Sequence, residues 1–323
     1  MSVEMKSLGE TGHNINNSGT ETNSSGRMPD FLIIGAMKSG TTSLFQLLER
    51  HPGIFVPYWK EPQYFSRDHK FNLGEKWYTD NFFDAREDQL IGEASTCYSR
   101  WPYYPHAAER IAKRLPNISL IYIMRHPVER AYSHYGHIMQ ERLIRNEEKI
   151  LTFEEALEEE KEIIDASLYM MQIERYLPLF SREQFLFLSF DELKSSPDAL
   201  LQRTQKFLGV EPIDLISQGE VNTNRWGDKV SITRARGFIE KIQWVSGISG
   251  IKNIIPKGKR QRLKDTLIHS KLLNSLFKSG LKDLRKSLSP LTPKTRERLL
   301  KQFEAPTNNL ERFLGWKLPT WHR

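Results

Sequence analysis

The sequence predicts an α/β domain, a three-layer sandwich in which helices flank a central parallel sheet of four or five strands. The first observation behind this prediction is a set of long apolar runs, at residues 31–34, 119–124 and 185–190. Such runs are typical of strands that are buried on both faces of a parallel sheet. The second observation is that a turn and then a helical pattern follow each run, as the βα repeat of this fold class requires.

Charge is distributed unevenly along the 323 residues. Residues 222–301 hold 20 lysines and arginines against 5 acidic residues, a balance of +15, whereas the whole chain carries +7 and the remainder therefore −8. This basic C-terminal third favours an anionic ligand or acceptor, or contact with a membrane surface. No nucleic-acid-binding motif accompanies it, so we expect no nucleic-acid partner.

Residues 1–28 are rich in Asn, Ser, Thr and Gly and nearly free of large apolar side chains. They predict a disordered leader, followed by one folded domain at residues 29–323. Cys97 is the only cysteine, so no intrachain disulfide can form. The sequence has no apolar run of 18 residues and no signal pattern, and we expect a cytoplasmic protein without a transmembrane anchor.

The segment between the first predicted strand and the first predicted helix has the features of a phosphate-binding loop. Gly35 and Gly40 bracket a tight turn, whose N–H groups can surround an anion together with the helix N-terminus. Lys38 adds a cation, and Thr41 and Thr42 add hydroxyl donors. The alternative is an ordinary turn with a chance lysine, but the fixed offsets of these residues favour phosphate binding.

The same loop departs from the Walker A motif, Gly-x-x-x-x-Gly-Lys-[Ser/Thr]. Gly35 and Gly40 keep the spacing of that motif, but Thr41 stands where the motif has lysine. Lys38 is the only lysine of the loop. We therefore expect a phosphate site that lacks the lysine of the triphosphate–magnesium arrangement.

Glu61 follows a short strand predicted at residues 54–56 and lies in an aromatic-rich segment before Pro62. A residue before proline avoids the helical region, so we expect an extended backbone at Glu61. Burial among rings would raise the pKa of its carboxyl group and make it a usable proton acceptor. On chemistry alone, a solvated loop glutamate is the simpler interpretation. Glu93 presents a similar choice, between a structural hydrogen-bond acceptor and a catalytic group.

Arg125 ends the apolar run at residues 119–124, which places it at the carboxyl edge of the sheet, where open α/β folds bind ligands. Ser133 lies eight residues on, in the predicted helix that follows. A guanidinium and a hydroxyl suit a phosphate monoester, and the alternative for Arg125 is a salt bridge at the sheet edge. His134 and His137 share this helix, but no third ligand occurs at zinc spacing, so we expect no metal site.

The later elements are predicted in less detail. An acidic helix covers residues 146–165, and a helix at 196–208 follows the strand at 185–190. Residues 222–236 are polar and basic and could close over a nucleotide, and a last pair of helices begins near Ser289. The Asp-Glu pair after the third apolar run imitates a Walker B site, which we discount because the Walker A lysine is missing.

Residues 29–42 resemble the 5′-phosphosulfate-binding loop of sulfotransferases that use 3′-phosphoadenosine 5′-phosphosulfate (PAPS), above all the heparan-sulfate-type enzymes and their bacterial relatives. Residues 61–65 match that family's Glu-Pro-x-[Phe/Tyr]-Phe segment, which carries the catalytic base. The resemblance implies that Lys38 and Glu61 are catalytic. It also implies that PAPS binds to Lys38, Ser39, Gly40, Thr41, Thr42, Arg125 and Ser133. Of these, Arg125 and Ser133 would form the 3′-phosphate site.

The resemblance implies a P-loop-like fold and transfer of a sulfuryl group from PAPS, without a metal, to a hydroxyl or amine of a carbohydrate, lipid or small molecule. Residues 93–98 are similar to the family's acceptor-side segment Glu-Lys-[Ser/Thr]-Pro-x-Tyr, but Ala94 and Thr96 replace its lysine and proline. Acceptor contacts of the family are therefore not carried over to this segment. The alternatives are a kinase or NTPase-like phosphotransferase, and a non-catalytic module that binds nucleotides or polyanions.

Overall fold

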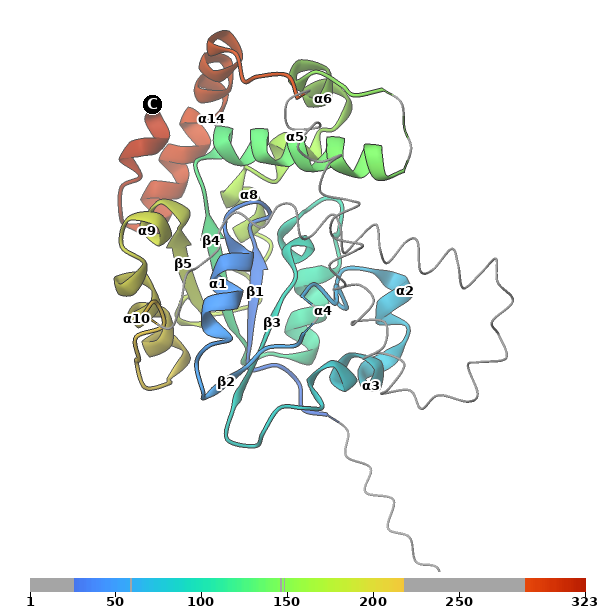
Figure 1. Ribbon diagram of the computed structural model, residues 1–323, viewed down its shortest axis with the longest axis vertical. Helices are drawn as coiled ribbons and strands as arrows, with labels where there is room; N and C mark the ends of the chain where they lie inside the picture. Colours follow the sequence, from blue (N-terminus) through green and yellow to red (C-terminus); the bar gives the residue numbers. More distant parts are fainter. Residues whose placement is uncertain (1–25, 59, 146, 148, 218–287) are drawn as a thin grey trace, which may run out of the picture.

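The computed structural model describes residues 26–58, 60–145, 147, 149–217 and 288–323. In this part of the chain, five parallel strands form one sheet with the order β2-β3-β1-β4-β5 (Figure 1). The strands are β1 (Phe31–Gly35), β2 (Ile54–Phe55), β3 (Leu90–Ala94), β4 (Ser119–Met124) and β5 (Phe185–Ser189). The prediction of a central parallel sheet flanked by helices is confirmed.

Helices cover both faces of the sheet, and α5 crosses above the carboxyl ends of the strands (Figure 1). The α-helices of the described residues are α1 (Thr41–Leu48), α2 (Asp68–Phe71), α3 (Gly74–Thr79), α4 (Ala107–Arg114), α5 (Pro127–Ile144), α6 (Phe153–Glu159), α7 (Glu162–Asp165), α8 (Tyr169–Ile173), α9 (Phe190–Ser195), α10 (Pro197–Leu208) and α14 (Pro293–Leu314). The short 3₁₀ helices are η1 (Asp80–Phe82), η2 (Thr96–Ser99), η3 (Arg182–Gln184) and η5 (Pro319–His322).

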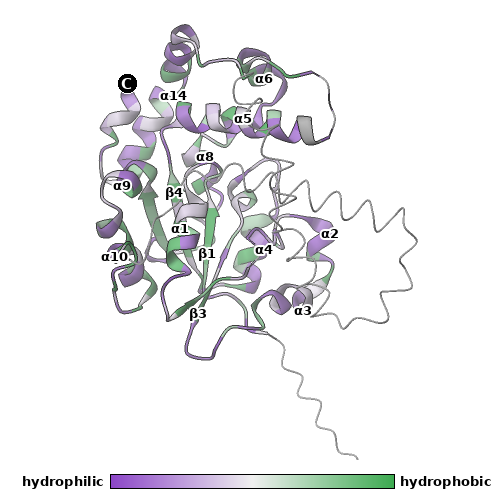
Figure 2. Ribbon diagram, in the orientation of Figure 1, coloured by the Kyte–Doolittle hydropathy of each residue, from purple (hydrophilic) through white to green (hydrophobic). Residues whose placement is uncertain are grey.

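The alternation of side chains along each strand divides the core into two layers. Phe31 and Ile33 of β1 pack with residues of α1 and α10, whereas Leu32 and Ile34 pack with residues of α4, α8 and α14. All four side chains are at most 3% exposed. Figure 2 shows the strands as a hydrophobic centre between helices whose outer faces are polar. Burial on both faces is the reason that this run is continuously apolar.

Strand β3 is the element that the apolar runs do not predict, because Gly92 and Glu93 interrupt its hydrophobic sequence. A glycine is required at position 92, since a Cβ atom there would lie 2.1 Å from the ring of Phe31 on the neighbouring strand β1. Glu93 is fully buried, and hydroxyl groups surround its carboxylate. The strand is therefore buried although it carries a charged residue.

Two predicted helical segments differ from the structure. The acidic segment forms two short helices, α6 and α7, because a capping box of Thr152 and Glu155 starts α6 and the non-helical backbone of Glu160 ends it. The predicted last pair of helices is one long helix, α14, which accommodates Pro306 and is followed by η5. The helix predicted after β4 is confirmed as α5.

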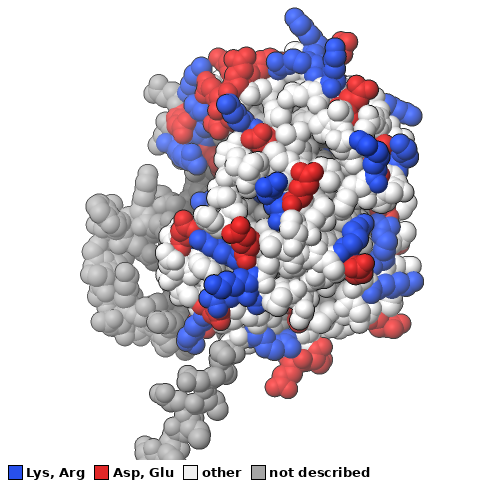
Figure 3. Space-filling view, turned by 180° about the vertical axis from the view of Figure 1, so that it is seen from behind, with Lys and Arg blue, Asp and Glu red and all other residues white. Residues whose placement is uncertain are grey.

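Several predictions fall outside the described residues: most of the leader, the 222–236 loop and most of the basic C-terminal third. No helix among residues 26–217 and 288–323 is long and apolar enough to cross a bilayer. On the face shown in Figure 3, basic and acidic side chains of the described residues are interspersed. Contact with a membrane surface therefore stays a prediction.

Replacing Gly92 by alanine should destabilise the fold by about 1–3 kcal/mol, the usual effect of overpacking a core. The added methyl group would force the Phe31 ring out of its place in the core. Urea unfolding measures the change in the free energy of unfolding. Gly53→Ala is the control, because its new methyl group would lie no closer than 3.3 Å to the His51 ring. Equal stabilities of the two variants would contradict this prediction.

Candidate active site

Three segments with polar side chains meet at the carboxyl edge of the sheet. They are the loop after β1, the residues just beyond β4, and the chain after β2, which pairs with the end of β3. Because β1 lies between β3 and β4, all three segments are adjacent. Ligands of open α/β sheets bind at such an edge.

The loop between Gly35 and Gly40 turns the chain from β1 into α1. Lys38 and Gly40 have positive φ angles of 67° and 91°. The N–H of Ser39 donates to the Ala36 carbonyl at 3.2 Å, and the Ser39 side chain is fully buried. Gly40 is the N-cap of α1 and offers no side-chain cap. No capping side chain therefore competes with an anion for the N-terminus of this helix.

The Arg125 side chain lies against this loop. Its guanidinium donates to the carbonyl oxygen of Lys38 at 3.4 Å and lies 5.1 Å from the centre of the Phe190 ring. The hydroxyl of Tyr169 fixes the backbone, because it donates to the Arg125 carbonyl and accepts from the Arg125 N–H. Arg125 also contacts the Glu129 carboxylate, at the long distance of 3.9 Å. The salt bridge at the sheet edge, the alternative role of Arg125, is therefore present but weak.

Ser133 is half-buried on α5. It lies one helical turn after Glu129 and therefore on the same face of the helix. Glu129 has a closer partner in Arg296, at 2.6 Å, than in Arg125. The long Arg125–Glu129 contact brings Arg125 near the first turn of this helix face, and among the described residues no hydrogen bond joins Ser133 to Arg125.

Glu61 does not have the extended backbone that the sequence predicts. Its φ angle is 67°, in the left-handed region. The reason is a tertiary contact: the Glu61 N–H donates to the carbonyl oxygen of Ala94, at the end of β3, at 2.9 Å. This bond turns the chain sharply before Pro62, against the local preference of a residue that precedes proline.

The carboxylate of Glu61 also lies in a polar setting rather than among aromatic rings. The rings of Tyr64 and Phe65 are buried in the core, where Tyr64 stacks on Tyr78 with 4.4 Å between ring centres. Glu61 Oε1 instead accepts hydrogen bonds from Lys60 Nζ at 3.1 Å and Thr96 Oγ1 at 3.2 Å. The side chain is 31% exposed, so the group can still reach a ligand.

Lys60 is a site residue that the sequence reasoning missed. Its ammonium donates to Thr41 Oγ1 and to Glu61 Oε1, both at 3.1 Å. Its side chain is only 13% exposed. Lys60 thereby connects the first residue of α1 to the predicted base. Its place next to Glu61 was the only signal in the sequence, and that signal does not indicate a contact with Thr41.

Glu93 is fully buried beneath this segment. Its carboxylate accepts hydrogen bonds from the hydroxyls of Tyr78 at 3.0 Å, Tyr98 at 2.9 Å and Ser95. Burial raises the pKa of Glu93 to about 7, because the loss of hydration outweighs the three hydrogen bonds and the charge of Glu61 adds repulsion. Glu93 has no exposed surface and its carboxylate is surrounded by three hydroxyls of the protein, so the geometry favours the structural interpretation.

His134 and His137 have other partners than a shared metal. His134 is buried 3.4 Å from the Arg130 guanidinium, and burial together with that charge lowers its pKa well below the ordinary value. His137 contacts Glu141 at 3.4 Å. Among the side chains that the structure places, no group of three or more His, Cys, Asp or Glu could hold a metal ion.

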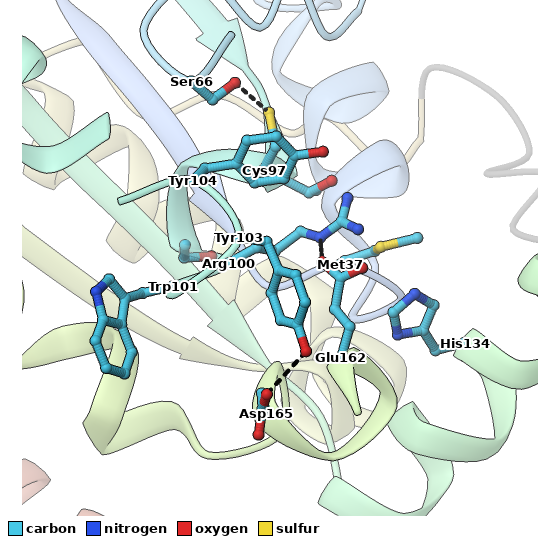
Figure 4. A network of polar contacts seen from close by, with 12 residues as sticks. Met37, Ser66, Cys97, Arg100, Trp101, Tyr103, Tyr104, His134, Glu162 and Asp165 are labelled. Atoms are coloured by element: carbon cyan, nitrogen blue, oxygen red, sulfur yellow. Dashed lines mark hydrogen bonds and ion pairs between the residues drawn. The ribbon is translucent and has the colours of Figure 1, made fainter. Parts of the chain in front are cut away.

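A polar layer continues from the loop toward α7. Arg130 contacts the carbonyl of Met37 in the loop at 3.5 Å and the His134 ring at 3.4 Å. Figure 4 shows Arg100 between Tyr104 and Glu162. Arg100 forms an ion pair with Glu162, and its guanidinium lies 5.3 Å from the centre of the Tyr104 ring. These contacts attach the segment after η2 to α7.

Comparison with known proteins assigns a family to this chain. Residues 28–225 match the family model of the sulfotransferase domain. Heparan sulfate glucosamine 3-O-sulfotransferase 5 of Homo sapiens is 30% identical over 193 residues, which are 58% of this chain and 55% of that protein. The membrane-associated sulfotransferase kil1 of Dictyostelium discoideum is 36% identical over 165 residues, 49% of this chain and 33% of that protein.

A solved structure supports the fold over a longer stretch. A sulfotransferase from Alicyclobacillus acidocaldarius aligns with a TM-score of 0.60 and 26% identity, covering 92% of this chain and 100% of that one. In contrast, this chain spans about half or less of the length of the curated relatives named above.

Glu93→Gln should change how stability depends on pH. Between pH about 4.5 and 7 the native protein keeps a proton on Glu93 that the unfolded chain releases, so this group lowers stability as pH rises. Over this range the titration of Glu93 lowers the free energy of unfolding by about 3 kcal/mol in total. Glutamine does not titrate, so the variant lacks this contribution. Urea unfolding of both proteins across this range should therefore give a less negative slope for the variant. Parallel curves would show that Glu93 titrates normally.

Proposed function

The chain belongs to the sulfotransferase domain family, and we propose that it transfers a sulfuryl group from PAPS to a hydroxyl or amine of a carbohydrate-type acceptor. One observation carries this proposal: Lys60 links the Glu61 carboxylate to Thr41 at the start of α1. A proton acceptor is thereby held beside a loop suited to a phosphate. That combination serves group transfer to an acceptor, and a module that only binds nucleotides does not require it.

The residues of the site fit the charges of PAPS. The uncapped N-terminus of α1 and the loop of Lys38, Ser39, Gly40, Thr41 and Thr42 suit the 5′-phosphosulfate. Arg125 and Ser133 suit the 3′-phosphate, because a guanidinium and a hydroxyl can each donate to its oxygens. The Arg125 guanidinium contacts the loop through the Lys38 carbonyl. The two phosphate sites would therefore be close enough for one nucleotide to fill both.

The chemistry of the residues follows from where charge develops. Bound PAPS supplies the sulfuryl group, and the phosphate oxygen that is bonded to its sulfur is the leaving group. As the acceptor oxygen or nitrogen bonds to sulfur, Lys38 would stabilise the negative charge on that phosphate oxygen. Glu61 would take the proton that the acceptor loses. In this step, side chains of this chain would stabilise the developing negative charge and accept the proton, so the step does not require a metal.

A carbohydrate acceptor is proposed because relatives of this chain are named heparan sulfate sulfotransferases. The test is transfer of radiolabelled sulfate from PAPS to heparan sulfate, to its desulfated forms and to lipid and phenol acceptors. We expect labelled product with at least one carbohydrate acceptor. Magnesium-dependent turnover of ATP without transfer from PAPS would instead support a phosphotransferase. Nucleotide binding without any turnover would support a binding module.

Glu61→Gln should abolish transfer while leaving nucleotide binding intact. Glutamine keeps the shape of the side chain but cannot accept a proton at neutral pH, so kcat should fall by at least about 10²-fold. The Kd for the product 3′-phosphoadenosine 5′-phosphate (PAP), measured by calorimetry, should barely change. Glu87→Gln is the control, since that exposed loop residue lies before β3, at the opposite edge of the sheet. A near-normal kcat for Glu61→Gln would remove Glu61 from the mechanism.

Arg125→Ala should discriminate between two nucleotides. A charge-assisted hydrogen bond contributes about 1.5–3 kcal/mol, so the loss of the guanidinium should weaken PAP binding by about 10- to 100-fold. AMP lacks the 3′-phosphate and should lose less than about 3-fold. Calorimetric titration of both nucleotides provides the comparison. If both weaken equally, Arg125 does not bind the 3′-phosphate.

A further inference from the structure

We propose that Glu93 is a positioning residue, which holds the turn that carries Glu61 through two buried hydroxyl groups. The inference rests on the proposed function in one respect, the role of Glu61 as proton acceptor. It assigns a task to a buried carboxylate that the transfer chemistry does not itself use.

The first connection runs through Ser95. Ser95 Oγ donates to one carboxylate oxygen of Glu93 and accepts the backbone N–H of Gln63 at 3.0 Å. Glu93 and Ser95 are both fully buried, so water does not compete for these bonds. A serine hydroxyl can otherwise rotate freely. The carboxylate fixes its proton and thereby leaves the oxygen lone pairs for Gln63.

The second connection runs through Tyr98. Its hydroxyl donates to the other oxygen of Glu93 at 2.9 Å and accepts the N–H of Phe65 at 3.5 Å. Each oxygen of one buried carboxylate is therefore linked, through one hydroxyl, to a backbone N–H of the segment that follows Glu61. Tyr78 also donates to Glu93, but its hydroxyl does not bond to the segment that follows Glu61.

The turn needs such support because its backbone is strained. Glu61 and Gln63 have φ angles of 67° and 59°, in a region that non-glycine residues rarely occupy. Pro62 has no N–H, so the turn has only two backbone donors. Both of them bond to the end of β3, at the Ala94 carbonyl and at Ser95 Oγ. Without the Ser95 bond, the hydrogen bond from Glu61 to the Ala94 carbonyl would be the one that remains to a backbone N–H of residues 61–63, and the position of the Glu61 carboxylate would be less defined.

Ser95→Ala is the direct test, and Tyr78→Phe is the matched control. The first variant cuts the link to Gln63, whereas the second removes a hydrogen bond to the same carboxylate and leaves both links in place. For Ser95→Ala we expect amide exchange in peptides containing Gln63 to accelerate by about 10-fold or more. We expect kcat to fall by about 10-fold while the Kd for PAP stays within about 2-fold. Tyr78→Phe should leave these quantities within about 2-fold.

A double variant separates positioning from a general loss of stability. If Ser95 acts through Glu61, adding Ser95→Ala to Glu61→Gln should cause no further loss of kcat. Additive losses, or equal effects of Ser95→Ala and Tyr78→Phe, would overturn the proposal. Unchanged exchange at Gln63 would overturn it as well. If the unmodified chain transfers nothing from PAPS, the proposed function fails, and the exchange measurement still decides whether the Ser95 hydroxyl, which donates to Glu93, holds this turn.

Discussion

The ammonium group of Lys60 lies between the Thr41 hydroxyl and the Glu61 carboxylate, and the arrangement of the site depends on these two contacts. Thr41 occupies the position at which a Walker A loop has its lysine. Lys60 brings a cation to the same place from a different segment of the chain. The Lys60 ammonium is thereby held next to the N-terminus of α1, with the Glu61 carboxylate paired to it. Because Lys60 is 13% exposed, this pair is less screened than an ordinary surface salt bridge.

The strained residues of the described chain are all in this neighbourhood. The non-glycine residues with positive φ among those that the structure places are Lys38, Glu61 and Gln63. Each such residue costs about 1–3 kcal/mol unless its surroundings enforce the conformation. In this structure, contacts with neighbouring segments hold all three residues in this conformation. The guanidinium of Arg125 contacts the Lys38 carbonyl, and the end of β3 binds the N–H groups of the other two. The sheet edge therefore supports geometry that the local sequence disfavours.

The sequence predicted the strands that long apolar runs mark and the loop that a fixed spacing of residues marks. The runs that form β1, β4 and β5 are continuously apolar because both faces of the sheet are covered, and the glycine spacing marked the loop. Strand β3 escaped prediction because Gly92 relieves a clash with Phe31 and Glu93 is stabilised by hydroxyls from distant residues. The backbone of Glu61 was predicted wrongly for the same kind of reason. A local rule for residues before proline cannot include a hydrogen bond to Ala94.

The strand order explains how one edge can serve two reactants. Strand β1 is flanked by β3 and β4. The chain runs from β1 to the β2–β3 side of the sheet and crosses after β3 to the β4–β5 side, so the strand order switches direction beside β1. Arg125 comes from the β4 side, whereas Glu61 is anchored to the β3 side. In a sulfuryl transfer, the groups proposed for the nucleotide and for the acceptor proton would then lie on opposite sides of the β1 loop. The transferred group would pass between them above β1, where Lys38 and the N-terminus of α1 supply the positive charge.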